Sequence, residues 1–501
     1  MLDFNGYDIG KNVHAFQQGE LRLAYDVNSG SLHILDESAY RLLQALKRLQ
    51  ADALEISAAA VQALLRQWRE QDGGGSAEPE TAWITEVWDE LAQLQREGSL
   101  FSPPVEEQAL GYPAEPLIKA MCLHVAHDCN LRCGYCFAGT GAFGGQRGLM
   151  DEATGKKAID FILQASRHRQ QCEVDLFGGE PLLNFERVKT LVHYGKNQAA
   201  ALGKEIKFTL TTNAVLLRPA IQEFLEREEI SVVLSLDGRP QIHDRMRPDV
   251  GGQGSYEQVK KHIQEFIARR PQTSAYATGL YYYVRGTYTH FNPDFDRDVR
   301  HMAELGIRQI SMEPVVAQPG DSYAFQEGDT AAILAAYDRL GEDVLALREK
   351  DPEFSFFHFN VALEQGPCLP KRLSGCGAGH EYVAISPEGD IYPCHQFVGQ
   401  ERFKMGSVHA ERPLRLEPRL VESFRAAHVF SKASCRACWA RFTCSGGCHA
   451  ANVNFTGGLQ DVYALGCELQ RKRLEVALYI RAKEIQRDSL KSGGKVDVQA
   501  D

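Results

Sequence analysis

At residues 124–136 the chain reads His124-Val125-Ala126-His127-Asp128-Cys129-Asn130-Leu131-Arg132-Cys133-Gly134-Tyr135-Cys136. This stretch places three cysteines at a C-x3-C-x2-C spacing. Three closely spaced thiolates can bind three irons of a [4Fe-4S] cube and leave the fourth iron without a protein ligand. Because an open iron can bind another molecule, the spacing predicts a cluster that takes part in chemistry.

Zinc is the alternative metal for these cysteines. A zinc site takes four ligands from Cys, His or carboxylate, and His124 or His127 could complete the number. Zinc modules, however, usually pair a C-x2-C motif with a distant second pair of ligands. The spacing therefore favours an iron–sulfur cluster.

A triplet at this spacing, with aromatic Tyr135 before its last cysteine, resembles the signature of the radical S-adenosylmethionine (SAM) enzymes. The resemblance implies that Cys129, Cys133 and Cys136 bind a [4Fe-4S] cluster whose open iron chelates the amino and carboxylate groups of SAM. It also implies that the reduced cluster cleaves SAM to a 5′-deoxyadenosyl radical. Such cofactors carry the difficult chemistry, while the protein positions and shields them.

The bulk composition is that of a cytoplasmic protein with several domains. At 501 residues and 44% hydrophobic content, the chain can form two to four domains. A net charge of -11 argues against a general nucleic-acid binder. There is no long apolar run and no signal peptide, so we expect neither a membrane span nor export.

The thirteen cysteines are unevenly placed. Three lie in the opening motif, eight fall between Cys368 and Cys467, and only Cys122 and Cys172 remain. Clustered cysteines in a reducing compartment are typically metal ligands or catalysts rather than disulfides. Cys122 and Cys172 lie in strand-like stretches, where we expect them to be small buried hydrophobic residues.

Residues 1–97 are predicted to form a small winged-helix-like module. Alternating residues at 21–26 and 31–35 flank a turn and predict a hairpin. Helical patterns follow at 38–50, 53–70 and 81–95, with a Gly-rich break at residues 71–76.

The function of this module has three possible interpretations. A winged helix often binds DNA, but Arg66 and Arg69 of the candidate recognition helix are offset by Glu70 and the acidic residues that follow. The module could also be a plain structural cap. It resembles the precursor-peptide recognition element of peptide-modifying enzymes, which implies that a leader peptide docks by strand addition to an exposed sheet edge.

Residues 98–116 form a linker by composition, and residues 117–350 alternate strand-like and helix-like runs. Alternation of this kind predicts parallel strands with helical crossovers. Six units fall short of the eight of a closed barrel. The predicted fold class is α/β, a partial (β/α)6 barrel, which is also the fold that the radical SAM resemblance implies. Strands are expected near residues 118–126, 173–177, 206–211, 231–236, 279–285 and 309–313.

Candidate SAM-binding residues follow four of these strands. Functional groups collect at the C-terminal ends of strands in α/β barrels. By resemblance, Glu180 accepts from the SAM amino group and the preceding glycines allow close approach of backbone to a ligand. The Arg285 guanidinium suits a carboxylate of SAM or of the substrate, and a salt bridge to Glu313 is its alternative. The resemblance implies SAM contacts by Gly178, Gly179, Glu180, Thr212, Asn213, Ser235, Asp237 and Arg285; for short polar side chains, caps and turns are an equal alternative.

Residues 351–475 resemble the cysteine-rich SPASM extension. The pattern is C-x12-G-x4-C from Cys376, then C-x2-C-x5-C-x3-C from Cys435, then Cys467. The resemblance implies two auxiliary [4Fe-4S] clusters, and zinc-ribbon chemistry is the alternative. Residues 476–501 are expected to form a helix and polar tail. By resemblance, the first auxiliary cluster takes Cys376, Cys394 and Cys448 with Cys368 as a possible fourth ligand, and the second takes Cys435, Cys438, Cys444 and Cys467.

The sequence is similar to that of the maturases of SCIFF peptides at residues 122–127, 136–145, 283–292, 375–379 and 392–397. The likeness implies thioether bonds between cysteine sulfur and the α-carbon of an acceptor residue, threonine in that family. It also implies a cysteine-rich precursor peptide as partner and an electron donor such as flavodoxin or ferredoxin. An anaerobic sulfatase-maturase-type oxidase and, from another class, a metal-binding regulator that contacts DNA are the alternatives. No catalytic acid or base is assigned, although His127, Glu313 and Asp237 are possible.

Overall fold

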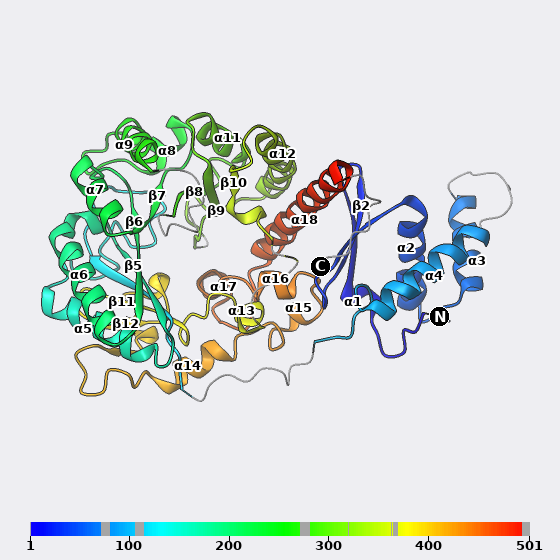
Figure 1. Ribbon diagram of the computed structural model, residues 1–501, viewed down its shortest axis with the longest axis horizontal. Helices are drawn as coiled ribbons and strands as arrows, with labels where there is room; N and C mark the ends of the chain where they lie inside the picture. The colour runs from blue at the N-terminus through cyan, green and yellow to red at the C-terminus, as the bar shows by residue number, and fades with distance from the viewer. Residues whose placement is uncertain are drawn as a thin grey trace.

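The computed structural model describes residues 2–71, 81–105, 115–270, 281–318, 320–361, 363 and 369–492. Figure 1 shows a sheet with surrounding helices on the left, a cysteine-rich part at the lower centre, and an N-terminal module on the right. The long helix α18 (Ala464–Ser492) runs between the barrel and the module.

The N-terminal module contains the predicted hairpin, β2 (Leu21–Asp26) and β3 (Leu32–Leu35), which pair antiparallel. Asp36 caps the next helix, because the amide of Ala39 donates to its Oδ1 at 2.7 Å. Residues 72–76 of the predicted break lie outside the described residues. The three helices that follow β3 are α2 (Glu37–Ala51), α3 (Ala58–Gln71) and α4 (Thr81–Glu97).

Two elements of the module were not predicted, the one-turn helix α1 (Ile9–Asn12) and strand β1 (Val13–Gln18). β1 pairs with β2, which gives a three-stranded sheet in the order β1-β2-β3. The strand lacks a strict alternation of buried and exposed residues, because it also contacts α18. A period of two was therefore absent from its sequence.

The predicted partial barrel is confirmed. Its six strands run parallel in sequential order from β4 to β9, with helical crossovers between them. The sheet does not close, since β4 pairs with β11 and β9 pairs with β10 rather than with each other. Residues 279–280 of the fifth expected strand lie outside the described residues. The strands are β4 (Ala120–Ala126), β5 (Gln171–Gly178), β6 (Glu205–Thr212), β7 (Ser231–Ser235), β8 (Tyr282–Tyr288) and β9 (Gln309–Pro314).

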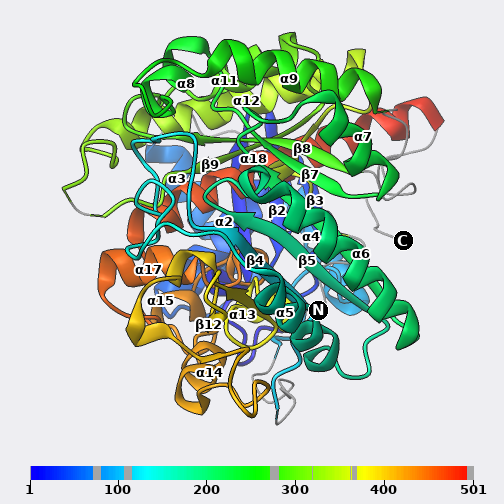
Figure 2. The same cartoon turned by 90° about the vertical axis from the view of Figure 1, so that its left-hand side faces the viewer.

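The helices of the barrel cover the outer face of this sheet (Figures 1 and 2). Residues such as Val174 and Leu176 point outward into the main hydrophobic core, so the alternate residue Asp175 points inward. The inner face is thereby left for polar side chains. The helices are α5 (Glu152–Ala165), α6 (Phe185–Ala201), α7 (Pro219–Arg227), α8 (Pro240–Met246), α9 (Tyr256–Arg269), α11 (Asp296–Glu304) and α12 (Asp329–Lys350).

The C-terminal part extends the barrel sheet at both ends and adds short helices. β11 pairs parallel with β4, and β12 and β13 continue antiparallel from it. α18 begins at Ala464 and carries Cys467, so it starts inside the region expected to belong to the SPASM extension. These elements are β10 (Ser355–Phe356), β11 (Tyr382–Ile385), β12 (Asp390–Tyr392), β13 (Gly406–Ser407), α13 (Leu369–Ser374), α14 (Pro418–Arg425), α15 (Ala433–Arg436), α16 (Arg441–Cys444) and α17 (His449–Thr456).

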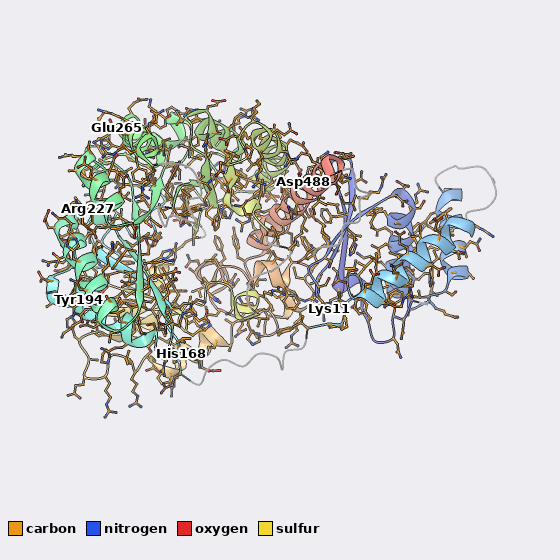
Figure 3. All side chains as sticks on the ribbon, in the orientation of Figure 1. Lys11, His168, Tyr194, Arg227, Glu265 and Asp488 are labelled. Carbon is orange, nitrogen blue, oxygen red and sulfur yellow. The ribbon has the colours of Figure 1, made fainter. Side chains whose placement is uncertain are left out.

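The module is fastened directly to the cysteine-rich part. The buried Arg441 guanidinium donates to the carbonyl of Lys11 at 3.0 Å and to Oδ1 of Asn12 at 2.7 Å. The ring of His14 stacks on Trp439 at 3.9 Å. Figure 3 labels Lys11 at this junction. Neighbours of Cys438 and Cys444 therefore hold the first strand of the module.

Among the described residues, no helix combines the length and apolarity needed to cross a membrane.

Candidate functional site

The loop after β4 brings the cysteine triplet together. Burial raises the pKa of Cys129 to about 12, and the charges of Glu180, Cys133 and Cys136 act in the same direction. The three thiols thus lie close enough together for the charge of one to shift the pKa of another. The amide of Leu131 donates to the sulfur of Cys129 at 3.4 Å, an interaction that suits a thiolate bound to iron.

A segment after β7 holds the other side of this loop. The amide of Gly134 donates to the carbonyl of Met246 at 2.8 Å, and that of Arg132 donates to Pro248 at 2.7 Å. The Arg132 guanidinium also donates to the carbonyl of Cys129 at 2.6 Å. Hydrogen bonds within the protein therefore hold the backbone of the cysteine loop.

Gly178 and Gly179 lie against the backbone of the same loop. A Cβ on Gly178 would lie 2.1 Å from the carbonyl oxygen of Ala126, and one on Gly179 would lie 2.2 Å from that of Asp128. Gly178 also has a φ of +132°, which disfavours other residues. The close approach expected of these glycines is thus made to the cysteine loop itself.

Glu180 is fully buried behind them. Its carboxylate accepts from the Thr212 hydroxyl at 2.8 Å, the Asn213 amide at 2.8 Å and the Leu182 amide at 3.0 Å. Burial raises its pKa to about 7, although these hydrogen bonds and Arg247 lower it. Since a carboxylate offers about four acceptor positions, about one remains for a ligand such as an ammonium group.

Asn213 connects β6 to the cysteine loop. Its side-chain amide donates to Oδ1 of Asn130 at 2.7 Å and approaches the sulfur of Cys129 at 3.6 Å. Glu180, Thr212 and Asn213 consequently form one hydrogen-bonded group beside the first cysteine.

Asp237 occupies a different environment from the other candidates. It is fully buried, accepts from the Tyr135 hydroxyl at 2.6 Å and from the amide of Thr287 at 3.1 Å, and lies 3.8 Å from Arg247. Burial raises its pKa despite Arg247. The structure therefore turns Asp237 toward the aromatic residue of the cysteine motif.

Arg247 was missed by the sequence reasoning. Its guanidinium donates to the Tyr135 hydroxyl at 2.9 Å, and its charge lowers the pKa of Cys133, which burial raises to about 11. Arg247 is only 8% exposed, and its Nε has no hydrogen-bond partner in the part of the chain that the structure describes. It lies among several basic residues after β7, so its sequence context carried no distinguishing signal.

Ser235, the last residue of β7, pairs with Arg285. Arg285 lies in the middle of β8 rather than at the predicted strand end, because β8 continues beyond it. Arg285 points to the inner face and is exposed, and the expected alternative, a salt bridge to Glu313, is absent among the described residues. Glu313 instead lies 3.3 Å from His358 and 3.5 Å from Arg473. Arg285 is therefore available to an anionic ligand.

Asp175 is an inner-face carboxylate that the sequence reasoning did not single out. Burial raises its pKa to about 7, while the Thr211 hydroxyl, which donates at 3.1 Å, and the charge of Arg285 lower it. The residue is one of several acids in strand-like stretches, and only the inward register of β5 distinguishes it.

His127 is buried rather than open to a substrate. Burial lowers its pKa to about 4, its ring stacks on Phe143, and its Nε2 lies 3.2 Å from Nδ1 of His124. Cys122 and Cys172 are buried, as expected.

The C-terminal cysteines fall into two groups. Cys376, Cys394 and Cys448 lie within reach of one another's charge, as do Cys435, Cys438, Cys444 and Cys467. These are the two sets that the SPASM resemblance implies. Cys368 lies outside the described residues.

Lys432 was also missed. It is 1% exposed, and its Nζ donates to the carbonyl of Gly446 at 2.8 Å. Burial lowers its pKa, while nearby cysteines of both C-terminal groups raise it. A buried ammonium group next to unpaired thiols fits a site whose sulfurs become negatively charged when they bind iron.

The donor sets fit iron–sulfur clusters better than zinc. Within the described residues, no group of three or more Cys, His, Asp or Glu side chains could hold a single metal ion. Cysteines of a cluster bind different irons and need not converge on one point.

Comparisons with known proteins agree with this chemistry. A family profile described as a 4Fe-4S single cluster domain matches residues 120–261, and the SPASM profile, described as an iron–sulfur cluster-binding domain, matches residues 376–439. An uncharacterized protein of Methanocaldococcus jannaschii is 34% identical over 197 residues, which cover 39% of this chain and 62% of that protein. The match thus spans less than two thirds of that relative.

An enzyme of Clostridium perfringens, named cysteine-type anaerobic sulfatase-maturating enzyme, is 25% identical over 367 residues, 66% of this chain and 89% of the relative. The solved structure of native anSMEcpe with bound AdoMet and Cp18Cys peptide superposes with a TM-score of 0.59 at 18% identity, covering 74% of this chain and 99% of that one. The cysteine loop at the mouth of the partial barrel and the two matched profiles both indicate iron–sulfur clusters. The chain is therefore similar, over its barrel and its cysteine-rich part, to radical SAM enzymes that carry a SPASM iron–sulfur domain.

Proposed function

We propose that this chain modifies a ribosomally made, cysteine-rich precursor peptide by installing thioether crosslinks between cysteine sulfur and the α-carbon of an acceptor residue, which is threonine by family likeness. The supporting observation is the union of a strand-edge module with two auxiliary cysteine groups. β3 is an edge strand that pairs only with β2 among the described residues, which suits strand addition by a leader peptide. The same module is held by residues next to Cys438 and Cys444.

SAM and the cluster on Cys129, Cys133 and Cys136 together supply a radical able to remove a hydrogen atom from a carbon. The chain's own residues would position the reactants. Glu180 is placed to accept from the SAM amino group with its remaining acceptor position, and Arg285 to bind a carboxylate. Asn213 would hold Cys129 and Asn130 in place beneath them.

Each thioether bond removes two hydrogens from the peptide. One leaves the α-carbon as a hydrogen atom and ends in 5′-deoxyadenosine. The cysteine thiol loses its proton, and bond formation between sulfur and carbon releases one electron. An auxiliary cluster is proposed to accept that electron, and an external donor such as flavodoxin or ferredoxin to reduce the first cluster. A cytoplasmic, reducing location would suit this chemistry.

A sulfatase-maturase-type oxidation of a cysteine or serine is the second candidate. The likeness to the clostridial enzyme favours it, because that match covers 89% of the relative. The proposed leader-docking module distinguishes the two, since oxidation of one residue in a protein needs no leader. A dependence of the reaction on the leader therefore decides between them.

The test uses enzyme reconstituted under argon with iron, sulfide, SAM and a reductant. Its substrate is a cysteine-rich precursor peptide, sought as a short open reading frame beside this gene and supplied with and without its leader. We expect a mass loss of two hydrogens per link, one deoxyadenosine per link, and loss of the reaction without the leader. SAM cleavage without crosslinking would contradict the thioether proposal, and an aldehyde product would support the second candidate.

A matched pair of cysteine variants controls for metal binding. Cys133→Ala removes a proposed ligand and should abolish deoxyadenosine formation. Cys172→Ala removes a buried thiol on β5, away from all three groups, and should keep it.

A further inference from the structure

A cavity of about 500 Å³ lies where the module, the barrel and the cysteine-rich part meet. The module contributes Tyr25 and the turn to Gly30, and the segment after β10 contributes Phe357 and His358. The remaining wall comes from Phe442 and Thr443, next to Cys444, and from the start of α18. The cavity therefore lies between the module and the cysteine-rich part, beside the segment that follows β10.

The barrel side of the cavity shares side chains with the inner face of the sheet. Phe357 stacks on Tyr283 of β8, with ring centroids 5.9 Å apart. His358 lies 2.9 Å from the hydroxyl of Ser311 and 3.3 Å from Glu313, both on β9. A molecule in the cavity would thus reach the inner face next to Arg285.

The module side of the cavity lies at the beginning of the edge strand. Tyr25 lines the cavity and pairs with Leu32, the first residue of β3. A peptide strand added antiparallel to β3 would run from Leu35 toward Leu32, so its C-terminal end would leave at the cavity. Residues that follow a leader are C-terminal to it, and this orientation would deliver them there.

The lining favours a peptide rich in acceptor groups. Of the described residues that line the cavity, none is aspartate or glutamate, whereas Arg372, Arg473, Asn360 and Gln470 carry donor groups. The Arg473 guanidinium is already paired with Glu313, which lies behind the lining. Backbone carbonyls and carboxylates are the complementary acceptors. Aromatic walls from Tyr25, Phe357 and Phe442 can contact small side chains between them.

We propose that this cavity is the passage through which the peptide substrate, docked antiparallel on β3, enters the barrel. The occupant is an extended, neutral or acidic peptide segment that follows the leader. The inference rests on the proposed function, because it needs a leader-bearing peptide.

The test places the photoreactive residue p-benzoylphenylalanine at Phe357, which is exposed and aromatic in the native protein. The precursor peptide is the same one used above, and its binding is first measured by fluorescence anisotropy of the labelled leader. After irradiation, mass spectrometry should map the attachment to residues just C-terminal of the leader. The same probe at Leu202, exposed at the end of α6, is the control.

A blocking variant gives a second, independent readout. Val361→Trp fills the cavity from the barrel side and should reduce peptide modification at least ~10-fold while the leader still binds. Leu202→Trp should not reduce it. Iron content of each variant reports whether the protein has folded, and the photoreactive variant keeps the test valid if Val361→Trp does not fold.

The outcomes separate the two levels of the proposal. Leader binding with attachment at Phe357 no stronger than at Leu202, or full modification by folded Val361→Trp, would overturn the passage and leave the proposed function standing. No binding of the precursor to the wild-type enzyme would overturn both.

Discussion

Two buried cations, Arg247 behind the first cysteine loop and Lys432 among the C-terminal cysteines, are balanced in different ways. Arg247 faces a carboxylate, Asp237, and donates to the hydroxyl of Tyr135. Lys432 donates to one carbonyl, and no described carboxylate lies within ion-pair distance of it. Among the described residues, the groups that favour its charge are cysteines.

This difference implies two kinds of cluster site. The first is organised by the protein, since hydrogen bonds from β6, the segment after β7 and Tyr135 hold its loop. The second depends on the cluster, because an unpaired buried ammonium is costly until thiolates balance it. Thiolates of a metal site exist at neutral pH mainly when metal is bound.

Removing all iron with a chelator should produce the largest difference between the two kinds of cluster site. Amides of residues 432–448 should lose protection from hydrogen exchange at least ~10-fold, because Lys432 loses its counter-charges. The amides of Arg132 and Gly134 should change much less, since they donate to the carbonyls of Pro248 and Met246. Exchange measured by mass spectrometry before and after chelation checks this, and equal loss in both segments would remove the distinction.

Arg247→Gln should produce the next largest effect. The substitution leaves Asp237 buried without its cation, and breaking a buried pair of this kind costs about 3 kcal/mol. Urea unfolding of the iron-free protein measures the change. Arg227→Gln, whose side chain lies on the outer surface (Figure 3), is the control and should change stability by less than ~0.5 kcal/mol.

The sequence predicted the barrel because its signals are local and periodic. Buried β-strands alternate with helices of ordinary length, and polar motifs follow the strands, so the six-stranded order could be inferred before any coordinates. Strand β1 was not predicted, because its two faces contact different parts of the protein. The strands that pair with the two edges of the barrel were not predicted either, since β11 pairs with β4 from more than two hundred residues away.

The residues of the candidate site also differ in whether the sequence could predict them. The cysteines carry their own spacing, and the structure gathers the described ones into three groups. Arg247 and Lys432 belong to no motif with a recognisable spacing. Each acquires a role only because folding excludes water from a cation that lies next to sulfur, and burial of a single residue cannot be read from a surface-like sequence context.

The pH dependence of Arg247→Gln sharpens the comparison further. Burial raises the pKa of Asp237 and Arg247 opposes this, so removing Arg247 should raise that pKa more. A raised carboxyl pKa gives stability that is present at low pH and is lost as the pH rises through it. The variant's deficit should therefore grow as the pH rises above about 4, the ordinary pKa of an aspartate, until Asp237 is ionised. Adding Asp237→Asn should abolish this growth and recover about 1 kcal/mol.

Lys432→Met should have the smallest effect and the opposite sign. In the iron-free protein the substitution removes an unpaired buried charge and should leave stability unchanged or raise it by about 1 kcal/mol. In the iron-loaded protein it removes a cation beside the thiolates, so the potential of an auxiliary cluster should become more negative. Urea unfolding and a redox titration followed by electron paramagnetic resonance measure the two effects. Destabilisation of the iron-free protein comparable to that of Arg247→Gln would mean that Lys432, too, is balanced by the protein.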